Sequence, residues 1–316
     1  DRRPMEGVSL SVDLRVQHVV RDELAKALDR YKAIAGVGIV LDVRTGEGIG
    51  MSSLPDFDPN DRAQALEKNR LNRATGGVFE MGSVFKAFTV AMALDSGKVT
   101  MDDSFDATRP LRVGRRTIND FHGKRRILSV AETFIYSSNI GTAKMMLAAG
   151  VDTQKAFMER IGLTTRTETD LPEVATPLLP PKWNELAAMT ISFGHGISVT
   201  PMQTAVATAA LVNGGRLIPP TFTPRSEAEA NELAQQVIDP RTSEIMRYLF
   251  RLNVLSGSGR RAEVPGYVVG GKTGTAEKIE NGRYVSDKRR NSFLSAFPMD
   301  DPRYVGLVVL DEPKPE

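Results

Sequence analysis

Apolar positions near both ends of the chain follow the pattern of short β-strands separated by turns. Near the start, a hairpin is expected from strands at 38–43 and 49–52. The stretch 8–14 alternates and also predicts a short strand. Between these, apolar residues recur at helical spacing over 16–33, which predicts an amphipathic helix. Three more strands are expected near the end, at 267–270, 292–297 and 304–310.

The apolar spacing becomes mostly helical over 81–213. Ser129 and Glu132 form a capping box, in which each side chain satisfies a backbone N–H that the first helical turn leaves unpaired. Thr200 and Gln203 form a second one. The middle of the chain is therefore expected to be a set of helices with defined starts.

Strands at both ends and helices in the middle predict an α+β fold. The first hairpin and the last three strands would form one antiparallel sheet of about five strands, flanked by helices and carrying an inserted, mainly helical lobe. The sheet lobe is expected from about 8–55 and 262–316, and the helical lobe from about 80–215. A site is expected where the sheet edge meets the helical lobe.

The composition of the chain excludes several classes of partner and catalytic group. With 41 Lys and Arg against 39 Asp and Glu, the net charge of +2 indicates neither a nucleic-acid partner nor an anionic membrane surface. The absence of cysteine removes thiolate nucleophiles and Cys-ligated metals. Three widely spaced histidines form no H-E-x-x-H pattern, so a zincin-type metal site is not expected. For His195, which has no evident Asp partner, a structural or substrate-rim role is expected.

Three short strings carry candidate chemistry, each at the boundary of an expected element. The first opens a helix predicted over 83–95, the second interrupts two helical runs, and the third follows the strand predicted over 267–270. In chain order they are Ser83-x-x-Lys86, Ser137-x-Asn139 and Lys272-Thr273-Gly274-Thr275.

The first string pairs a nucleophile with a base. A serine hydroxyl reacts poorly unless a neighbouring group removes its proton. Residues three apart on a helix share a face, so Lys86 can reach the Ser83 hydroxyl. Lys86 must be neutral to act as a base. Burial and a second cation both lower a lysine pKa, and Lys272 is the obvious second cation.

The other strings supply polar groups for a substrate. Ser137 can relay a proton between Lys86 and a leaving amine, and the Asn139 carboxamide can hold a substrate amide. Thr273 and Thr275 offer hydroxyls to a terminal carboxylate. The backbone N–H of Thr275 can join that of Ser83 in an oxyanion hole.

These three strings, in this order, are typical of class A β-lactamases and penicillin-binding proteins. Over nearly its whole length the chain resembles the transpeptidase domain of class B penicillin-binding proteins, and within them the division-specific (FtsI-type) septal transpeptidases. The likeness extends to F-G-H-G-I-S-V-T-P-M-Q at 193–203 and S-F-L-S-A-F-P at 292–298. One departure is Met81-Gly82 before the nucleophile, where the family usually has Pro-Gly.

The resemblance implies the penicillin-binding/β-lactamase-like fold and a serine D-Ala-D-Ala transpeptidase that needs no cofactor. The enzyme would be acylated by a D-Ala-D-Ala stem peptide, pass the acyl group to an amine of a neighbouring stem, and be trapped by β-lactams. The implied catalytic residues are Ser83, Lys86, Ser137, Asn139 and Lys272, with a substrate-binding strand edge at Thr273, Gly274 and Thr275.

The resemblance also implies a place in the cell. The catalytic domain would lie on the periplasmic face of a bacterial inner membrane, beside a septal glycosyltransferase and other division proteins. The membrane anchor and an N-terminal pedestal domain are expected to lie outside this chain.

Other functions share this constellation. An elongation-specific transpeptidase is the nearest alternative in function, and only the resemblance favours a division-specific one. A D,D-carboxypeptidase or serine β-lactamase would hydrolyse the acyl-enzyme, which requires a base positioned to activate water, and no convincing extra Glu or carbamylated Lys is evident. A non-catalytic β-lactam sensor would be acylated without transferring the acyl group.

Overall fold

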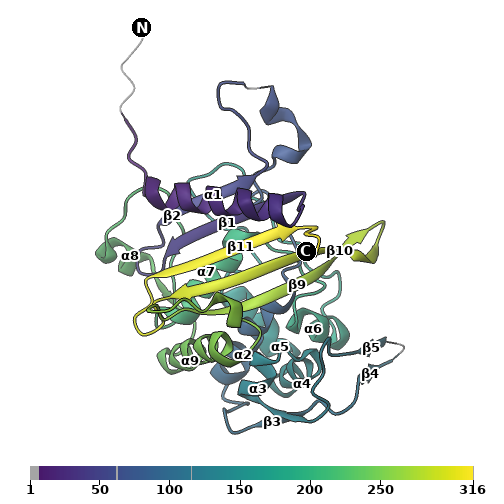
Figure 1. Cartoon of the computed structure of the whole chain (residues 1–316). Coiled ribbons are helices and arrows are strands. Elements are labelled where there is room, and N and C mark those ends of the chain that lie inside the picture. Colours follow the sequence, from purple (N-terminus) through teal and green to yellow (C-terminus); the bar gives the residue numbers. More distant parts are fainter. Residues whose placement is uncertain (1–6, 62, 115, 316) are drawn as a thin grey trace.

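The computed structural model of the protein describes residues 7–61, 63–114 and 116–315. Its centre is a five-stranded antiparallel sheet in the order β2-β1-β11-β10-β9 (Figure 1). Strands from the two ends of the chain therefore lie side by side, as the pattern predicts. Their bounds are β1 (Ala35–Asp42), β2 (Gly48–Leu54), β9 (Gly270–Glu280), β10 (Arg283–Phe297) and β11 (Tyr304–Asp311).

Helices cover the sheet and build the second lobe (Figure 1). Helix α1 packs against β1 and β2, α7 against β1 and β11, and α9 against β9, while α2 to α6 form most of the helical lobe. The helices are α1 (Leu14–Arg30), α2 (Lys86–Asp95), α3 (Val130–Ile135), α4 (Asn139–Ala149), α5 (Val151–Arg160), α6 (Glu185–Ser192), α7 (Pro201–Val212), α8 (Glu227–Leu233) and α9 (Pro240–Ser256).

Two packing features explain how the layers close. A Cβ on Gly36 would lie 2.7 Å from Leu28 Cδ1, and one on Gly38 would lie 2.8 Å from Val20 Cγ1, so these glycines of β1 let α1 approach the sheet closely. Helix α7 buries every residue except Ala209. A helix that is buried on every side is a core helix, and α7 lies between the sheet and the helical lobe.

The predicted fold class is confirmed, together with both capping boxes. The strand predicted over 8–14 is wrong: this segment makes only isolated backbone bonds, such as Ser11 N–H to Phe222 O at 2.8 Å. Its last polar residue, Asp13, is the N-cap of α1 and accepts the Arg15 N–H. An alternating pattern forms a strand only where a partner strand completes the ladder.

The mostly helical reading of 81–213 also needs correction. This part of the chain also contains two small two-stranded sheets, which the sequence pattern did not predict. Two further short strands pair after α7. The bounds are β3 (Ser104–Asp106) with β6 (Ile127–Ser129), β4 (Leu111–Val113) with β5 (Arg116–Ile118), and β7 (Arg216–Leu217) with β8 (Gln235–Gln236).

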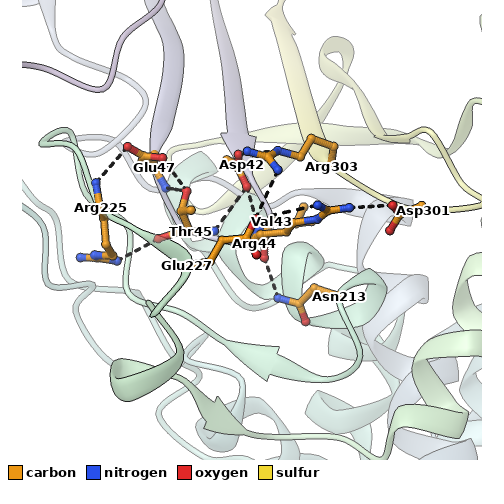
Figure 2. Close-up of polar contacts among 10 residues, drawn as sticks. All are labelled: Asp42, Val43, Arg44, Thr45, Glu47, Asn213, Arg225, Glu227, Asp301 and Arg303. Atoms are coloured by element: carbon orange, nitrogen blue, oxygen red, sulfur yellow. Dashed lines mark hydrogen bonds and ion pairs between the residues drawn. The ribbon is translucent and has the colours of Figure 1, made fainter. Parts of the chain in front are cut away.

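A charged network holds the turn between β1 and β2 (Figure 2). The buried Asp42 accepts the backbone N–H of Arg44 at 2.8 Å and forms an ion pair with Arg303 at 2.8 Å. Glu47 accepts the backbone N–H of Arg225 at 3.0 Å. These contacts tie the turn to the segments that precede β11 and α8, and so brace the sheet lobe against the rest of the chain.

Candidate active site

The nucleophile candidate lies on a short turn rather than on the α-helix that was predicted. Residues Gly82–Phe85 form a 3₁₀ turn, and helix α2 begins only at Lys86. In a 3₁₀ turn, side chains three positions apart lie directly above one another. Lys86 Nζ is 3.0 Å from Ser83 Oγ, and the lysine side chain is almost completely buried. The geometry thus joins the two groups that the sequence spacing paired.

Three glycines let this turn lie between two other segments. Gly82 has φ +58°, and a Cβ there would be 2.3 Å from the carbonyl oxygen of Thr275. A Cβ on Gly194 would be 2.0 Å from the carbonyl oxygen of Gly82, and one on Gly274 would be 2.8 Å from that of Met81. The nucleophile turn is therefore in van der Waals contact with β9 on one side and with the loop at 193–196 on the other.

Ser137 bridges the two lysines. It connects α3 and α4 with φ +55°, a left-handed conformation that is uncommon for a residue with a Cβ. Its hydroxyl oxygen is 3.0 Å from Lys86 Nζ and 3.0 Å from Lys272 Nζ. Lys86 Nζ also donates to the Ser137 carbonyl oxygen at 2.5 Å. One hydroxyl thus contacts both amines and can pass a proton between them.

The conformation of this connection depends on Asp120, which the sequence analysis missed. Ser138 Oγ donates to Asp120 Oδ2 at 2.8 Å, and the Ile140 N–H donates to Asp120 Oδ1 at 2.9 Å. Asn139 Nδ2 donates to the Asn119 carbonyl oxygen at 2.9 Å. An isolated Asp in a loop far from the serine carries no sequence signal for this role, because only the fold brings the two segments together.

The third string lies inside an edge strand. The strand predicted over 267–270 is wrong, since β9 begins at Gly270 and runs through Lys272 and Thr273. The Thr273 hydroxyl donates to Ser258 Oγ at 2.8 Å, and Ser258 in turn contacts the buried Asn253 of α9. Ser258 was not among the predicted site residues, although it lies directly beside one of them.

Burial and mutual repulsion decide the protonation of the lysines. Burial, and then the charge of Lys272, hold the pKa of Lys86 well below its ordinary value, while the Asp120 carboxylate opposes this. Burial lowers the pKa of Lys272 to about 7. Two buried amines that share one hydroxyl cannot both hold a proton cheaply, so the site favours a neutral Lys86.

His195 lies close to this centre without a hydrogen bond to it. Burial, and then the charge of Lys86, lower its pKa to about 4. Its ring packs against Phe193 and Tyr284, with centroids 5.5 and 5.6 Å away, and its Nδ1 is buried without a partner among the described residues. A neutral imidazole held by ring contacts is compatible with the structural or rim role, which stays a prediction.

Neither a metal-binding cluster nor a membrane-spanning helix is present in the described part of the chain, residues 7–61, 63–114 and 116–315. No group of three or more His, Cys, Asp or Glu side chains within it is placed to hold a metal ion. No helix within the same ranges has the length and apolar character needed to cross a membrane.

The sequence is similar to those of known proteins. Residues 36–316 match the model of the penicillin-binding protein transpeptidase domain family. The chain is 43% identical over 314 residues to the "Probable peptidoglycan D,D-transpeptidase FtsI" of Caulobacter vibrioides, covering 96% of this chain and 53% of that protein. It is 33% identical to the "Probable peptidoglycan D,D-transpeptidase PenA" of Neisseria gonorrhoeae, covering 99% of this chain and 54% of that protein. The chain thus spans about half the length of these relatives.

Solved structures of penicillin-binding proteins have a similar fold. The apo transpeptidase domain of penicillin-binding protein 3 from Burkholderia pseudomallei superposes with a TM-score of 0.87 at 31% identity, covering 99% of this chain and 90% of that one. Penicillin-binding protein 3 from Mycobacterium tuberculosis, in complex with aztreonam, gives a TM-score of 0.87 at 27% identity, covering 97% of this chain and 73% of that one. On fold and sequence, the chain belongs to the penicillin-binding protein transpeptidase family, as a transpeptidase domain of class B.

Proposed function

We propose that this domain is a peptidoglycan D,D-transpeptidase that works through an acyl-enzyme on Ser83. One observation carries the proposal: Lys86 Nζ is 3.0 Å from both Ser83 Oγ and Ser137 Oγ, with Lys272 on the far side of the Ser137 hydroxyl. A depressed lysine pKa next to a serine at the meeting of two lobes is a catalytic arrangement rather than a structural ion pair.

In the acylation step, neutral Lys86 takes the proton of Ser83 as the serine oxygen attacks the carbonyl carbon between the two D-alanines. The C–N bond to the terminal D-alanine then breaks. The leaving amine receives a proton through Ser137, which contacts both lysines. Backbone N–H groups of Ser83 and of Thr275 would stabilise the oxyanion, since the edge of β9 at Thr275 lies against the nucleophile turn.

In the transfer step, the amine of a second stem peptide attacks the acyl carbon. A new C–N bond forms, the bond to Ser83 Oγ breaks, and the proton lost by the amine returns to the serine through Lys86. The same residues therefore serve both steps in opposite directions, as microscopic reversibility requires. No cofactor takes part in this scheme.

Substrate would lie along β9 as an added strand, a common mode of peptide recognition. Strand β9 is at the edge of the sheet, and Thr275 is exposed while Gly274 packs on the nucleophile turn. The Thr273 hydroxyl, which donates to Ser258 Oγ in this structure, would rotate away from that serine to bind the terminal carboxylate. Asn139 Nδ2 is already bonded to Asn119, so its Oδ1 would accept a substrate N–H.

Transfer to an amine is favoured over hydrolysis. Among the described residues, no carboxylate hydrogen-bonds to Ser83 or Lys86, which favours transfer over a lactamase mechanism in which a carboxylate activates water at the acyl site. A septal role, with division proteins and a glycosyltransferase as partners at the periplasmic face of an inner membrane, is proposed from the likeness to the FtsI-type relative.

A labelled penicillin tests the proposal. We expect mass spectrometry to show one adduct per chain on Ser83 that persists for hours, and a D-Ala-D-Ala donor with an amine acceptor to yield a cross-linked product. Ser83→Ala should abolish both, while Ser104→Ala, an exposed serine on β3, should leave both intact. Rapid release of hydrolysed penicillin would instead identify a lactamase, and acylation without transfer would identify a sensor.

A further inference from the structure

A buried carboxylate lies three residues before the nucleophile and takes no part in the chemistry proposed above. The Glu80 side chain is 6% exposed. Its Oε1 accepts two hydrogen bonds, from the Gly196 N–H at 2.7 Å and from the Tyr284 hydroxyl at 3.1 Å. Its Oε2 is buried and has no hydrogen-bond partner among the described residues. Burying a carboxylate oxygen without a hydrogen bond is energetically unfavourable, so the position of Glu80 calls for a functional explanation.

The first partner belongs to the loop that supports the nucleophile turn. The Gly82 N–H donates to the Gly194 carbonyl oxygen at 3.2 Å, and the two backbones are in contact there. Gly196 lies two residues further along the same loop, with φ +78°. Through its bond to Gly196, Glu80 fixes this loop to the segment that leads into Ser83.

The second partner belongs to the outer end of the β9–β10 hairpin, which extends beyond the rest of the sheet (Figure 1). The pairing of β10 with β9 is regular from Ala296 to Arg289, then shifts, and resumes at Val285 opposite Lys278. The residues between, 286–288, form a bulge, and a bulge redirects the strand beyond it. The redirected end places the Tyr284 hydroxyl on Glu80, 204 positions away along the chain.

Few other charges act on Glu80. Burial raises its pKa, whereas the bonds from Gly196 and Tyr284 and the charge of Arg290 on β10 lower it. Arg290 itself lies over the Phe79 ring, 4.6 Å from its centroid, and pairs with Asp311 at 3.5 Å. The hydrogen bonds to Glu80 are therefore made by Gly196 and Tyr284, and Arg290 acts only at longer range.

We propose that Glu80 is a positioning residue for acyl transfer, joining the loop at 193–196 and the outer β9–β10 hairpin to the turn that carries Ser83. The inference rests on the proposed function. The loop touches the turn at Gly82, on the side away from β9, while the hairpin continues the strand whose Gly274 and Thr275 touch the turn on the other side. The position of the loop and the hairpin therefore sets the distance between the serine oxygen and the β9 edge. Because misplacement by a fraction of an ångström weakens a transition state more than a ground state, the loss should fall on the acylation rate constant.

The test uses the labelled-penicillin reaction, with the acylation rate constant and the initial binding constant measured separately. Tyr284→Phe should lower the acylation rate constant by about tenfold, the size expected for one hydrogen bond to a carboxylate. Glu80→Ala should lower it by about a hundredfold, and Glu80→Gln, which retains the accepting oxygen, should recover most of the loss. Binding should change less than the rate constant in each case.

Controls separate positioning from stability. Tyr248→Phe and Glu244→Ala remove the same groups from exposed sites on α9 and should be silent. The double variant Glu80→Ala with Tyr284→Phe should be no slower than Glu80→Ala alone, because both changes break one bond. A merely structural role would reduce the labelled fraction and the melting temperature but leave the rate constant of the remaining folded protein unchanged.

Two results would overturn the inference while the proposed function stands. One is a normal acylation rate in Tyr284→Phe, a conservative change at a partly exposed residue that should fold. The other is an additive loss in the double variant. If the wild-type protein fails to label at Ser83, the proposed function fails instead, and the two failures are distinguishable.

Discussion

Replacement of Lys272 by Met tests whether one buried amine keeps the other neutral. Met matches the length and volume of the fully buried lysine stem and removes only the charge and its hydrogen bonds. The loss of a positive charge raises the pKa of Lys86, since Lys272 is the second cause that lowers it. At any pH on the acid limb, less Lys86 is then neutral, and acylation should be slower.

The size of the effect follows from the geometry. Both Nζ atoms lie 3.0 Å from the Ser137 oxygen, so a tetrahedral arrangement about that oxygen separates them by about 5 Å. At an effective dielectric constant of about 20, two unit charges at that distance repel by about 3 kcal/mol, or roughly a hundredfold in a protonation equilibrium. The pKa of Lys272 is about 7, so the repulsion is largest below neutral pH and fades above it.

The assay is the second-order rate of labelled-penicillin acylation from about pH 5 to about pH 10, which reports the free enzyme. We expect the acid limb of Lys272→Met to move to higher pH and the rates to converge in alkaline solution. Lys144→Met, which removes a lysine bonded to the Asp106 carbonyl on the helical lobe, is the matched control. An unmoved limb refutes the coupling, and an equal loss at every pH would mean that Lys272 only orients Ser137 or the substrate.

Two further predictions concern His195 and Gly82. The pKa of His195 is lowered from 6.5 to about 4, so the neutral imidazole contributes fully to stability above pH 6.5, and this contribution is lost as pH falls toward 4. Over that range the free energy of unfolding, measured by urea titration, should drop by about 3 kcal/mol. His195→Phe should flatten this part of the pH dependence. Gly82→Ala must adopt φ +58° and push its methyl group against the Thr275 carbonyl, so we expect about 3 kcal/mol or more of destabilisation and lost acylation. A Gly82→Ala protein that melts and labels like wild type would show that the turn can move away from β9.

Local sequence was enough for several of the elements. The periodicity over 304–310 predicted a strand that the structure extends by one residue, to Tyr304–Asp311, and the hydrogen bonds at Ser129 and Thr200 start helices where the sequence places them. Such features succeed because hydrophobic period and capping act over a few neighbouring residues. The strand at 8–14 failed because strand formation needs a distant partner, which no local pattern reports.

The residues of the candidate site likewise fall into those that the sequence predicted and those that only the structure revealed. Ser83 and Lys86 could be paired from their spacing alone, since any helical turn brings them together. Ser258, Asp120 and Glu80 could not be predicted, because each acts through a bond to a segment between 15 and 204 positions away.

The order of hydrophobic, capping and turn residues thus determined which stretches become helices and strands, and which short strings carry reactive groups. Only the tertiary structure decided how buried those groups are and which charges face one another. Desolvation and repulsion depend on the surroundings of an atom in space, which chain neighbours alone do not set. The reactivity expected of Ser83 therefore belongs to the folded domain, where Lys86 and Lys272 lie buried around one hydroxyl.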